Sequence, residues 1–365
     1  MIAFVVNSGS SSIKWELLDV DSGERMRGGI VERIGENGVD HAGAMRVILE
    51  ELGGGHPDVI GHRVVHGGSR FTTATIVTDE VERAIEELSA LAPLHNPANL
   101  LGIRAAREAF PGVPNVAVFD TAFHQSIGPA AYTYAIDSAV AEEHGVRRYG
   151  FHGTSYQFVS ARAAELLGRP LDELRLIVLH LGNGASACAI DGGRSVDTSM
   201  GLTPLEGLVM GTRSGDIDAG ILFHLGRAGY SLADLDALLN RRSGLTGLAG
   251  GNDMRDVLAG VDAGDAASIL AFDVYVHRLR RYIGAYLATL GGVDAIVFTA
   301  GVGENAARVR EAALAGMEWA GIRLDGERNA VRGTTVVSAD DSPVAVLVVP
   351  TNEELEIARQ AAALV

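Results

Sequence analysis

Two arginines and a histidine lie in glycine-bracketed stretches of the sequence, where a hydrophobic core would not need them. Arg63 lies in the apolar segment 60–68, Arg213 lies in a turn between glycines, and His152 lies in the loop 149–155. A guanidinium group is a rigid fork of N–H donors that matches a carboxylate or a phosphate. Two such cations could stabilise the charge that develops on a transferring phosphoryl group. The alternative is a structural ion pair or edge position for Arg63 and a solvated loop for His152.

Two turns rich in glycine and serine, in residues 4–14 and 179–189, resemble one another. An overlay places Gly9 on Gly184 and Ser11 on Ser186, each between two apolar strands, so each segment is predicted to be a β-hairpin. Free backbone N–H groups and hydroxyls in such turns suit a phosphate. One such turn alone usually binds nothing, but the repeat, with Lys14 after the first turn, favours a nucleotide held between two related domains. No G-x-x-x-x-G-K-S/T motif occurs, so this is not a P-loop.

Two carboxylates stand at positions where a ligand could meet them. Asp120 follows a predicted buried strand, at the edge where open α/β sheets place their ligands, and is either a cap or a group facing a substrate. Residues 351–354 fit a capping box, with Thr351 as N-cap and Glu354 at the third helical position. Glu353 then lies in the first helical turn, where it either complements the helix dipole or holds a hydrated Mg²⁺.

Hydrophobic periodicity predicts the elements that must position these residues. We expect a helix capped by Thr78, a helix with Asn96 as N-cap and Pro97 as its first residue, and a long helix capped by Asp265. The core stripe of the long helix is predicted to be Ile269, Phe272, Val276, Leu279, Ile283 and Leu287. Strands are expected at 13–18, 26–34, 60–68, 115–119, 175–181, 187–190, 294–299 and 344–349, and further helices at 44–52, 155–167 and from 300 onward.

Composition sets limits on the function. A chain of 365 residues with 47% hydrophobic residues suits two domains. Its net charge of −16 argues against a nucleic-acid partner, which would require clustered Lys and Arg, and suggests a soluble cytosolic protein. The single cysteine, Cys188, cannot form an internal disulfide and is expected to be buried. The first six residues are predicted to be a strand and not a signal peptide, and no apolar run is long enough to span a bilayer.

Eight segments, in register from the first strand to the last helix, make the chain resemble the acetokinase family, a branch of the actin-like and sugar-kinase-like ATPases. The segments are 7–14, 61–67, 119–124, 149–155, 180–184, 211–218, 301–305 and 350–354. The resemblance implies an α/β fold of two ribonuclease-H-like domains with a nucleotide cleft between them. It places the first domain at 1–124, with helix 354–365 packing back on it, and the second at 125–353. It also implies a cytoplasmic homodimer.

The activity that this resemblance implies is reversible, direct phosphoryl transfer from ATP to acetate, giving ADP and acetyl phosphate, with Mg²⁺ or, as a substitute, Mn²⁺. Asn7 and Glu353 would position the metal. The catalytic residues would be Asp120, His152 and Arg213. Residues contacting acetate would be Arg63, Val65, Leu94, His95, Phe151 and Pro204. The nucleotide would be held by Ser10, Ser12, Lys14, His180, Leu181, Gly182, Asn183, Gly184, Asp253, Met254, Arg255, Gly301, Val302, Gly303, Glu304 and Asn305.

Two departures and three alternatives qualify this expectation. The stretch 31–57 is shorter than the family pattern, and Ala219 replaces the proline that usually follows residues 215–218. A dehydrogenase is one alternative, since residues 301–306 approximate a dinucleotide fingerprint, although Asp325 fits its acidic position only loosely. An actin-like ATPase is another, but it has no need of the two arginines. The third is a kinase of propionate or butyrate with the same mechanism.

Overall fold

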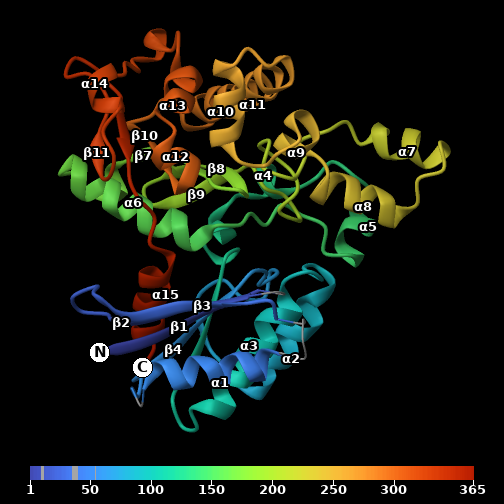
Figure 1. The fold of residues 1–365 in the computed structure, drawn as a ribbon, viewed down its shortest axis with the longest axis vertical. Helices are drawn as coiled ribbons and strands as arrows, with labels where there is room; N and C mark the ends of the chain where they lie inside the picture. The colour runs from blue at the N-terminus through green and yellow to red at the C-terminus, as the bar shows by residue number, and fades with distance from the viewer. Residues whose placement is uncertain (10–11, 35–39, 54) are drawn as a thin grey trace. The chain divides into compact units, whose positions relative to one another are not determined.

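The computed structural model describes residues 1–9, 12–34, 40–53 and 55–365 (Figure 1). The chain forms two compact units, the first of residues 1–125, 151–158 and 352–365 and the second of residues 126–150 and 159–351. Residues 151–158, assigned to the second domain from the sequence, thus cluster with the first unit. Each unit contains one six-stranded mixed sheet among its described residues. The predicted α/β class is confirmed.

The sheet of the first unit has the order β3-β2-β1-β4-β6-β5. Strands β1, β2 and β3 form an antiparallel meander. On its other side β1 pairs in parallel with β4, which in turn pairs in parallel with β6. The bounds are β1 Ile2–Ser8, β2 Ser12–Asp19, β3 Arg25–Glu32, β4 Val59–Val64, β5 Thr75–Ile76 and β6 Asn115–Phe119.

Side chains alternate between the two faces of this sheet, as the strand period requires. Phe4 packs with Met45 and Ile48 of α1 (His41–Leu52) on one face. Val5 packs with Ile357 of α15 (Glu353–Ala362) on the other, so the C-terminal helix completes the core of the first unit. The other helical elements here are α2 Asp79–Glu87, η1 Leu88–Ala90, α3 Asn96–Ala109 and η2 Ala122–Ser126.

The sheet of the second unit has the order β9-β8-β7-β10-β12-β11. Strand for strand, this corresponds to β3-β2-β1-β4-β6-β5 of the first unit. The strands are β7 Arg175–Leu181, β8 Ala185–Asp191, β9 Arg194–Thr198, β10 Ala295–Thr299, β11 Thr335–Val336 and β12 Ala345–Val348. Here β7–β9 form the meander, and β10 and β12 run parallel to β7. The duplication suggested by the two hairpins is therefore present at the level of topology. Cys188 is buried in β8, as expected.

Helices of the second unit, among them α11 and α12, pack against its sheet. Helix α6 (Gly153–Leu167) starts in the first unit and continues into the second. The others are α4 Pro129–Tyr132, α5 Ser138–Glu143, η3 Leu171–Glu173, α7 Gly220–Arg227, α8 Leu232–Arg241, α9 Gly244–Ala249, α10 Met254–Asp262, α11 Ala266–Leu290, α12 Ala300–Asn305, α13 Ala307–Leu314, η4 Glu318–Ala320 and α14 Gly326–Asn329. None of the helices in the described part of the chain has the length and hydrophobicity needed to cross a membrane.

Several local predictions fail at helix ends, whereas those for Thr78 and Asp265 as N-caps are confirmed. The N-cap of α3 is His95, one residue before the expected Asn96. The predicted capping box at α15 is wrong, because its N-cap is Asn352, whose side chain accepts from Leu355 N. Helix α6 begins at Gly153, two residues earlier than expected.

The predicted core stripe of α11 is only partly correct. Ile269 is exposed and Leu287 is half-buried, whereas Phe272, Val276, Leu279 and Ile283 are buried. The stripe drifts because 3.6 residues per turn brings Tyr275, Tyr286 and Leu290 onto the buried face instead.

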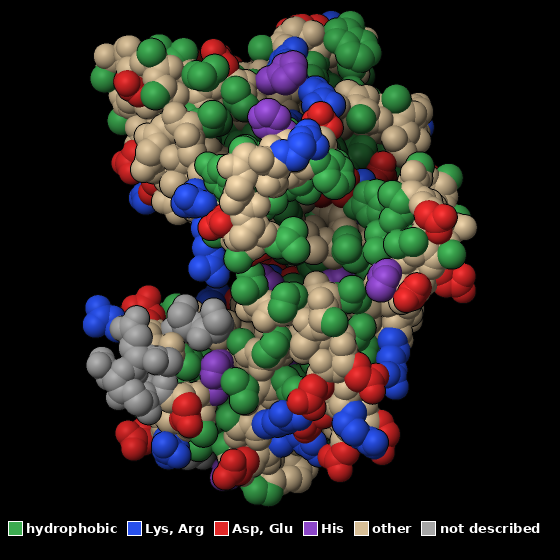
Figure 2. Space-filling model, turned by 90° about the vertical axis from the view of Figure 1, so that its right-hand side faces the viewer, with side chains coloured by type: hydrophobic (Ala, Val, Ile, Leu, Met, Phe, Trp, Pro, Cys, Tyr) green, Lys and Arg blue, Asp and Glu red, His purple; other side chains and the backbone are tan. Residues whose placement is uncertain are grey.

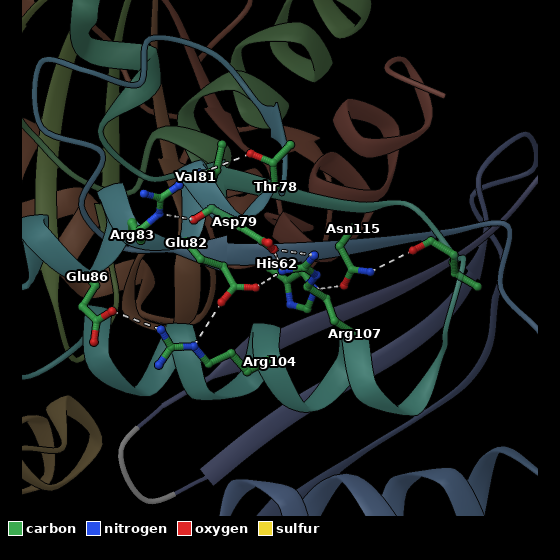
Figure 3. Close-up of polar contacts among 11 residues, drawn as sticks. His62, Thr78, Asp79, Val81, Glu82, Arg83, Glu86, Arg104, Arg107 and Asn115 are labelled. Atoms are coloured by element: carbon green, nitrogen blue, oxygen red, sulfur yellow. Dashed lines mark hydrogen bonds and ion pairs between the residues drawn. The ribbon is translucent and has the colours of Figure 1, made fainter.

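Ion pairs join helices α2 and α3 (Figure 3). Glu82 accepts hydrogen bonds from Arg104, at 3.0 Å, and from Arg107. In the same region, His62 Nε2 of β4 bonds to Asn115 Oδ1 at 2.7 Å (Figure 3). Burial lowers the pKa of His62 to about 4, although Asn115 and Glu82 act in the opposite direction. The histidine is therefore neutral and structural at physiological pH.

Candidate functional site

Both glycine-rich turns are hairpin turns, as predicted. Ser8 opposes Ile13 across the first hairpin, and Leu181 opposes Ala185 across the second. Gly9 and Gly182 occupy equivalent positions, because each directly follows the first strand of its hairpin. The overlay of Gly9 on Gly184 is thus wrong by two residues. Ser10 and Ser11 lie outside the described residues, and Ser12 begins β2.

An arginine and an aspartate form a two-point ion pair at the carboxyl ends of the parallel strands of the first unit. Arg63 Nε and Nη2 donate to the two carboxylate oxygens of Asp120 at 2.9 and 2.6 Å. Asn7 Oδ1 accepts from Arg63 Nη1 at 3.4 Å. The three residues come together because they stand near the ends of β1 and β4 and just after β6, which are parallel neighbours.

Charge and burial act against each other in this pair. Asp120 is fully buried, which raises the pKa of its carboxyl group, while Arg63 opposes that rise. Burial acts to lower the pKa of Arg63, but the carboxylates of Asp120 and Glu353 outweigh it and raise that pKa overall. Arg63 and Asp120 therefore form an ionised pair. Removing either partner would leave the other charge buried and unpaired.

Two glutamates of α15 lie at the same edge of the first unit. Glu353 Oε2 accepts from Thr154 Oγ1 at 2.9 Å, and its charge acts on both Arg63 and Asp120. Glu354 pairs with Lys14 of β2. Glu354 is therefore used for this ion pair and not for a capping box.

His152 is held in a strained backbone conformation next to Asp120. Its φ of +58° is left-handed, which is unusual for a residue with a Cβ atom and is often found at functional sites. Gly153 N donates to Asp120 O at 3.0 Å, and a Cβ atom on Gly153 would lie 2.3 Å from that oxygen. His124 Nε2 donates to Phe151 O at 2.9 Å on the other side of His152. These contacts fix the loop against the end of β6.

The residues expected to contact acetate are distributed over both units. Val65 and Phe151 are buried in the first unit, where the rings of His66 and Phe151 lie 5.5 Å apart. Leu94 also belongs to the first unit, but it is 48% exposed. His95 is the N-cap of α3, and Pro204 belongs to the second unit.

A cavity of about 590 Å³ lies in the second unit beside the turn of the β7–β8 hairpin. Eight of the residues expected to bind nucleotide line it: Gly182, Asn183, Asp253, Met254, Arg255, Gly301, Val302 and Asn305. His180, Leu181, Gly184, Gly303 and Glu304 do not line it. Glu304 Oε1 accepts from Thr351 N at 3.4 Å instead.

Sequence reasoning missed seven residues that line this cavity. They are Gly211, Leu245, Asn252, Leu258, Tyr275, Ala306 and Arg332. Most come from α9, α10, α11 and the loops beside them, so no short motif contains them. Gly211, in the segment 211–218, and Ala306, in the segment 301–306, are the two that lie within glycine-containing motifs.

Arg213 lies in the second unit and differs from Arg63 in its electrostatic partners. Its Nη1 donates to Pro204 O at 3.0 Å, and burial lowers the pKa of its guanidinium group. Within the described ranges, no ion pair joins Arg213 to a carboxylate. A desolvated cation without a counter-ion is a suitable ligand for an anion.

The fold with two six-stranded sheets of the same topology also occurs in another kinase structure. A structure of a putative N-acetylmannosamine kinase from Listeria monocytogenes shares this fold over the whole chain, with a TM-score of 0.51 at 12% identity. The Acetokinase family model matches residues 37–359. The protein belongs to the acetokinase family, which confirms the resemblance found in the motifs.

Individual relatives support this assignment. The chain is 63% identical to an acetate kinase of Leifsonia xyli, over 98% of this chain and 97% of the relative. It superimposes on the crystal structure of Porphyromonas gingivalis acetate kinase with a TM-score of 0.96 and 42% identity, covering 100% and 99% of the two chains. It also superimposes on the crystal structure of a propionate kinase from Francisella tularensis with a TM-score of 0.95 and 37% identity, covering 100% of both chains.

Proposed function

We propose that this protein is an acetate kinase that transfers the γ-phosphoryl group of ATP to acetate. A carboxylate oxygen of acetate forms a bond to the γ-phosphorus, the bond to the β-phosphate oxygen breaks, and acetyl phosphate and ADP result. The observation that carries the proposal is the Arg63–Asp120 pair at the strand ends, in a chain 54–63% identical to relatives named acetate kinase.

Cationic groups supply most of the catalysis in this proposal. Acetate is already an anion at neutral pH, so its attack on phosphorus requires no strong base. The obstacle is the charge on the phosphates, which Arg213 and His152 would stabilise at the equatorial oxygens. Arg63 would hold the acetate carboxylate through the guanidinium edge that faces Asn7, since Asp120 engages its other two nitrogens.

The nucleotide would occupy the cavity of the second unit. Its lining combines the glycine turn of the second hairpin, apolar side chains suited to a base, and the first residues of α10 and α12. Backbone N–H groups at the turn would meet phosphate oxygens. Lys14, from the first hairpin, would meet the terminal phosphates.

The oxygen atoms available in the first unit suit Mg²⁺. Asn7 contributes an amide oxygen and Glu353 a carboxylate, both hard donors. Over the described residues, no group of three or more His, Cys, Asp or Glu side chains is arranged to hold a metal. This matches a cation that keeps several waters and takes its remaining ligands from phosphates. When bound, Mg²⁺ would neutralise charge on the phosphates.

A coupled assay of ADP formation with acetate, propionate and butyrate tests the proposal. Strictly acetate-dependent ADP formation is expected, with weaker use of propionate, because one methylene changes binding by only about 1–3 kcal/mol. Hydrolysis of ATP that ignores the acid would instead favour an actin-like ATPase. Preference for propionate would favour the alternative that the Francisella tularensis structure illustrates.

The proposed enzyme is a cytoplasmic homodimer without nucleic-acid partners. Hydrophobic side chains are exposed on the face that Figure 2 turns toward the viewer, the side where Figure 1 places α7 and α8. Phe223 of α7 is 68% exposed and Leu232 of α8 is 87% exposed. Such a face is suited to a subunit contact. Light scattering of the wild type and of Phe223→Glu should give a dimer and a monomer, respectively.

A further inference from the structure

Three side chains join the loop of residues 204–216 to helix α11. Asp216 Oδ1 accepts from Gly207 N at 2.8 Å, and Tyr282 Oη donates to Asp216 Oδ2 at 2.9 Å. Arg278 donates from Nη1 to Gly207 O at 2.7 Å and from Nη2 to Asp216 O at 3.0 Å. The two ends of the segment from 207 to 216 are thus fixed to each other and to one helix. We call Asp216, Arg278 and Tyr282 the loop lock.

Arg213 lies inside the segment that the loop lock closes. Met210 N donates to Arg213 O at 3.2 Å, which makes a tight turn just before the lock. Gly215 has a φ of +66°, and a Cβ atom there would lie 2.4 Å from Gly207 O. The backbone on both sides of Arg213 therefore has little freedom as long as the lock is intact.

The other side of the same loop contacts the nucleotide cavity. Gly211 N donates to Asn183 O, and Leu245 N donates to Met210 O, both at 2.9 Å. Asn183, Gly211 and Leu245 all line the cavity. Hydrogen bonds thus hold the Arg213 loop to α11 at its two ends and to the second hairpin at Gly211, entirely within the second unit.

Residues other than the loop lock form the buried face of α11. Leu279 and Ile283, each directly after a lock residue in the sequence, already bury the apolar face of the helix. Polar groups removed from water cost stability unless they are paired, and here a half-buried carboxylate, guanidinium and phenol are paired with one another or with the loop backbone. Such a network is well suited to fixing one loop conformation.

We propose that Asp216, Arg278 and Tyr282 are positioning residues that set the catalytic rate by holding Arg213 in place beside the nucleotide cavity. The inference rests on the proposed acetate kinase function, in which Arg213 stabilises the transferring phosphoryl group. It predicts that loosening the lock lowers kcat and leaves the binding of both substrates nearly unchanged.

Two tyrosines of α11 provide a matched pair of variants. Their rings lie 5.7 Å apart, but only Tyr282 bonds to Asp216, whereas Tyr286 Oη is buried without a hydrogen-bond partner in the described structure. Tyr282→Phe should lower kcat about tenfold, the value of one charge-assisted hydrogen bond, with KM for ATP and acetate changed less than about twofold. Tyr286→Phe should match the wild type.

A double-mutant cycle shows whether the effect passes through Arg213. In an Arg213→Ala background, Tyr282→Phe should cause no further loss of kcat, because the group that the lock positions is gone. Hydrogen exchange of the peptide containing residues 207–216 should accelerate in Tyr282→Phe and not in Tyr286→Phe. A second pair, Arg278→Ala and Arg280→Ala, extends the comparison, since Arg280 instead bonds to carbonyls at the end of α13.

These results distinguish a failure of the loop lock from a failure of the proposed acetate kinase function. An active wild type with unchanged kcat in Tyr282→Phe overturns the loop lock and leaves the proposed function standing. Equal losses of kcat in the presence and absence of Arg213 also overturn it, since the lock would then act elsewhere. A wild type without acetate-dependent ADP formation overturns the proposed function and the inference with it.

Discussion

Gly153→Ala should disable the proposed site without touching a charged group. The added Cβ atom would lie 2.3 Å from Asp120 O and 2.9 Å from Phe123 Cβ. A carbon–oxygen contact needs about 3.3 Å, so the backbone of Asp120 or of His152 must move by about 1 Å. Such a displacement at reacting groups can lower kcat about 100-fold. Overpacking of this kind also lowers the free energy of unfolding by about 1–3 kcal/mol.

The assay is steady-state kinetics for acetate and ATP, with thermal unfolding of the same samples. Gly284→Ala is the control, because Gly284 lies within α11 and no atom lies within 4 Å of its added Cβ. This variant should keep its kcat and gain up to about 1 kcal/mol in stability. If Gly153→Ala also retains kcat, the contact between Gly153 and Asp120 does not position the site.

Three further variants test other parts of the structure. Val65→Ala should enlarge the buried acyl site and raise the kcat/KM ratio of propionate to acetate about tenfold; an unchanged ratio would remove Val65 from that site. Arg213→Ala should lower kcat about 100- to 1,000-fold with little change in KM for acetate, and near-normal turnover would exclude it from the transition state. His62 has a pKa of about 4 when folded and about 6.5 when unfolded, so its contribution to stability is complete above pH 6.5 and is lost as pH falls toward 4, by about 2 kcal/mol at pH 5. Urea unfolding at pH 7 and pH 5 should show a smaller loss in His62→Gln, and equal losses would contradict the buried neutral histidine.

The strands and the two hairpins could be predicted because their signals are local. A buried strand such as 175–181 is an uninterrupted apolar run between turn residues, and its observed bounds match the expected ones. Helix ends were less predictable because tertiary contacts compete for the capping side chains. Asn96 would serve as a cap in an isolated helix, but here its amide bonds to the backbone N and O of His66, at 3.1 and 3.0 Å.

The cavity lining shows a second limit of sequence reasoning. Short motifs contain residues that are neighbours in the chain, such as Gly301 and Val302. Leu258 and Tyr275 reach the same cavity from two different helices whose packing no local pattern specifies. The loop lock could not be predicted either. Apolar periodicity identifies the buried face of α11 but gives no role to its polar residues Arg278 and Tyr282.

The two arginines that looked equivalent in the sequence differ in the charge that they can offer a substrate. Arg63 is paired at two points with a buried carboxylate, so much of its charge is already neutralised. In the proposed reaction it would therefore orient the acetate carboxylate without binding it tightly. Arg213 is desolvated, and the partners of its guanidinium group are a carbonyl oxygen and a thioether, so its charge stays uncompensated until an anion arrives. Because interactions that strengthen only in the transition state raise kcat, the proposed function makes Arg213 the arginine whose position matters most for the rate. The proposed loop lock, built from three half-buried polar side chains, would therefore affect kcat more than substrate binding.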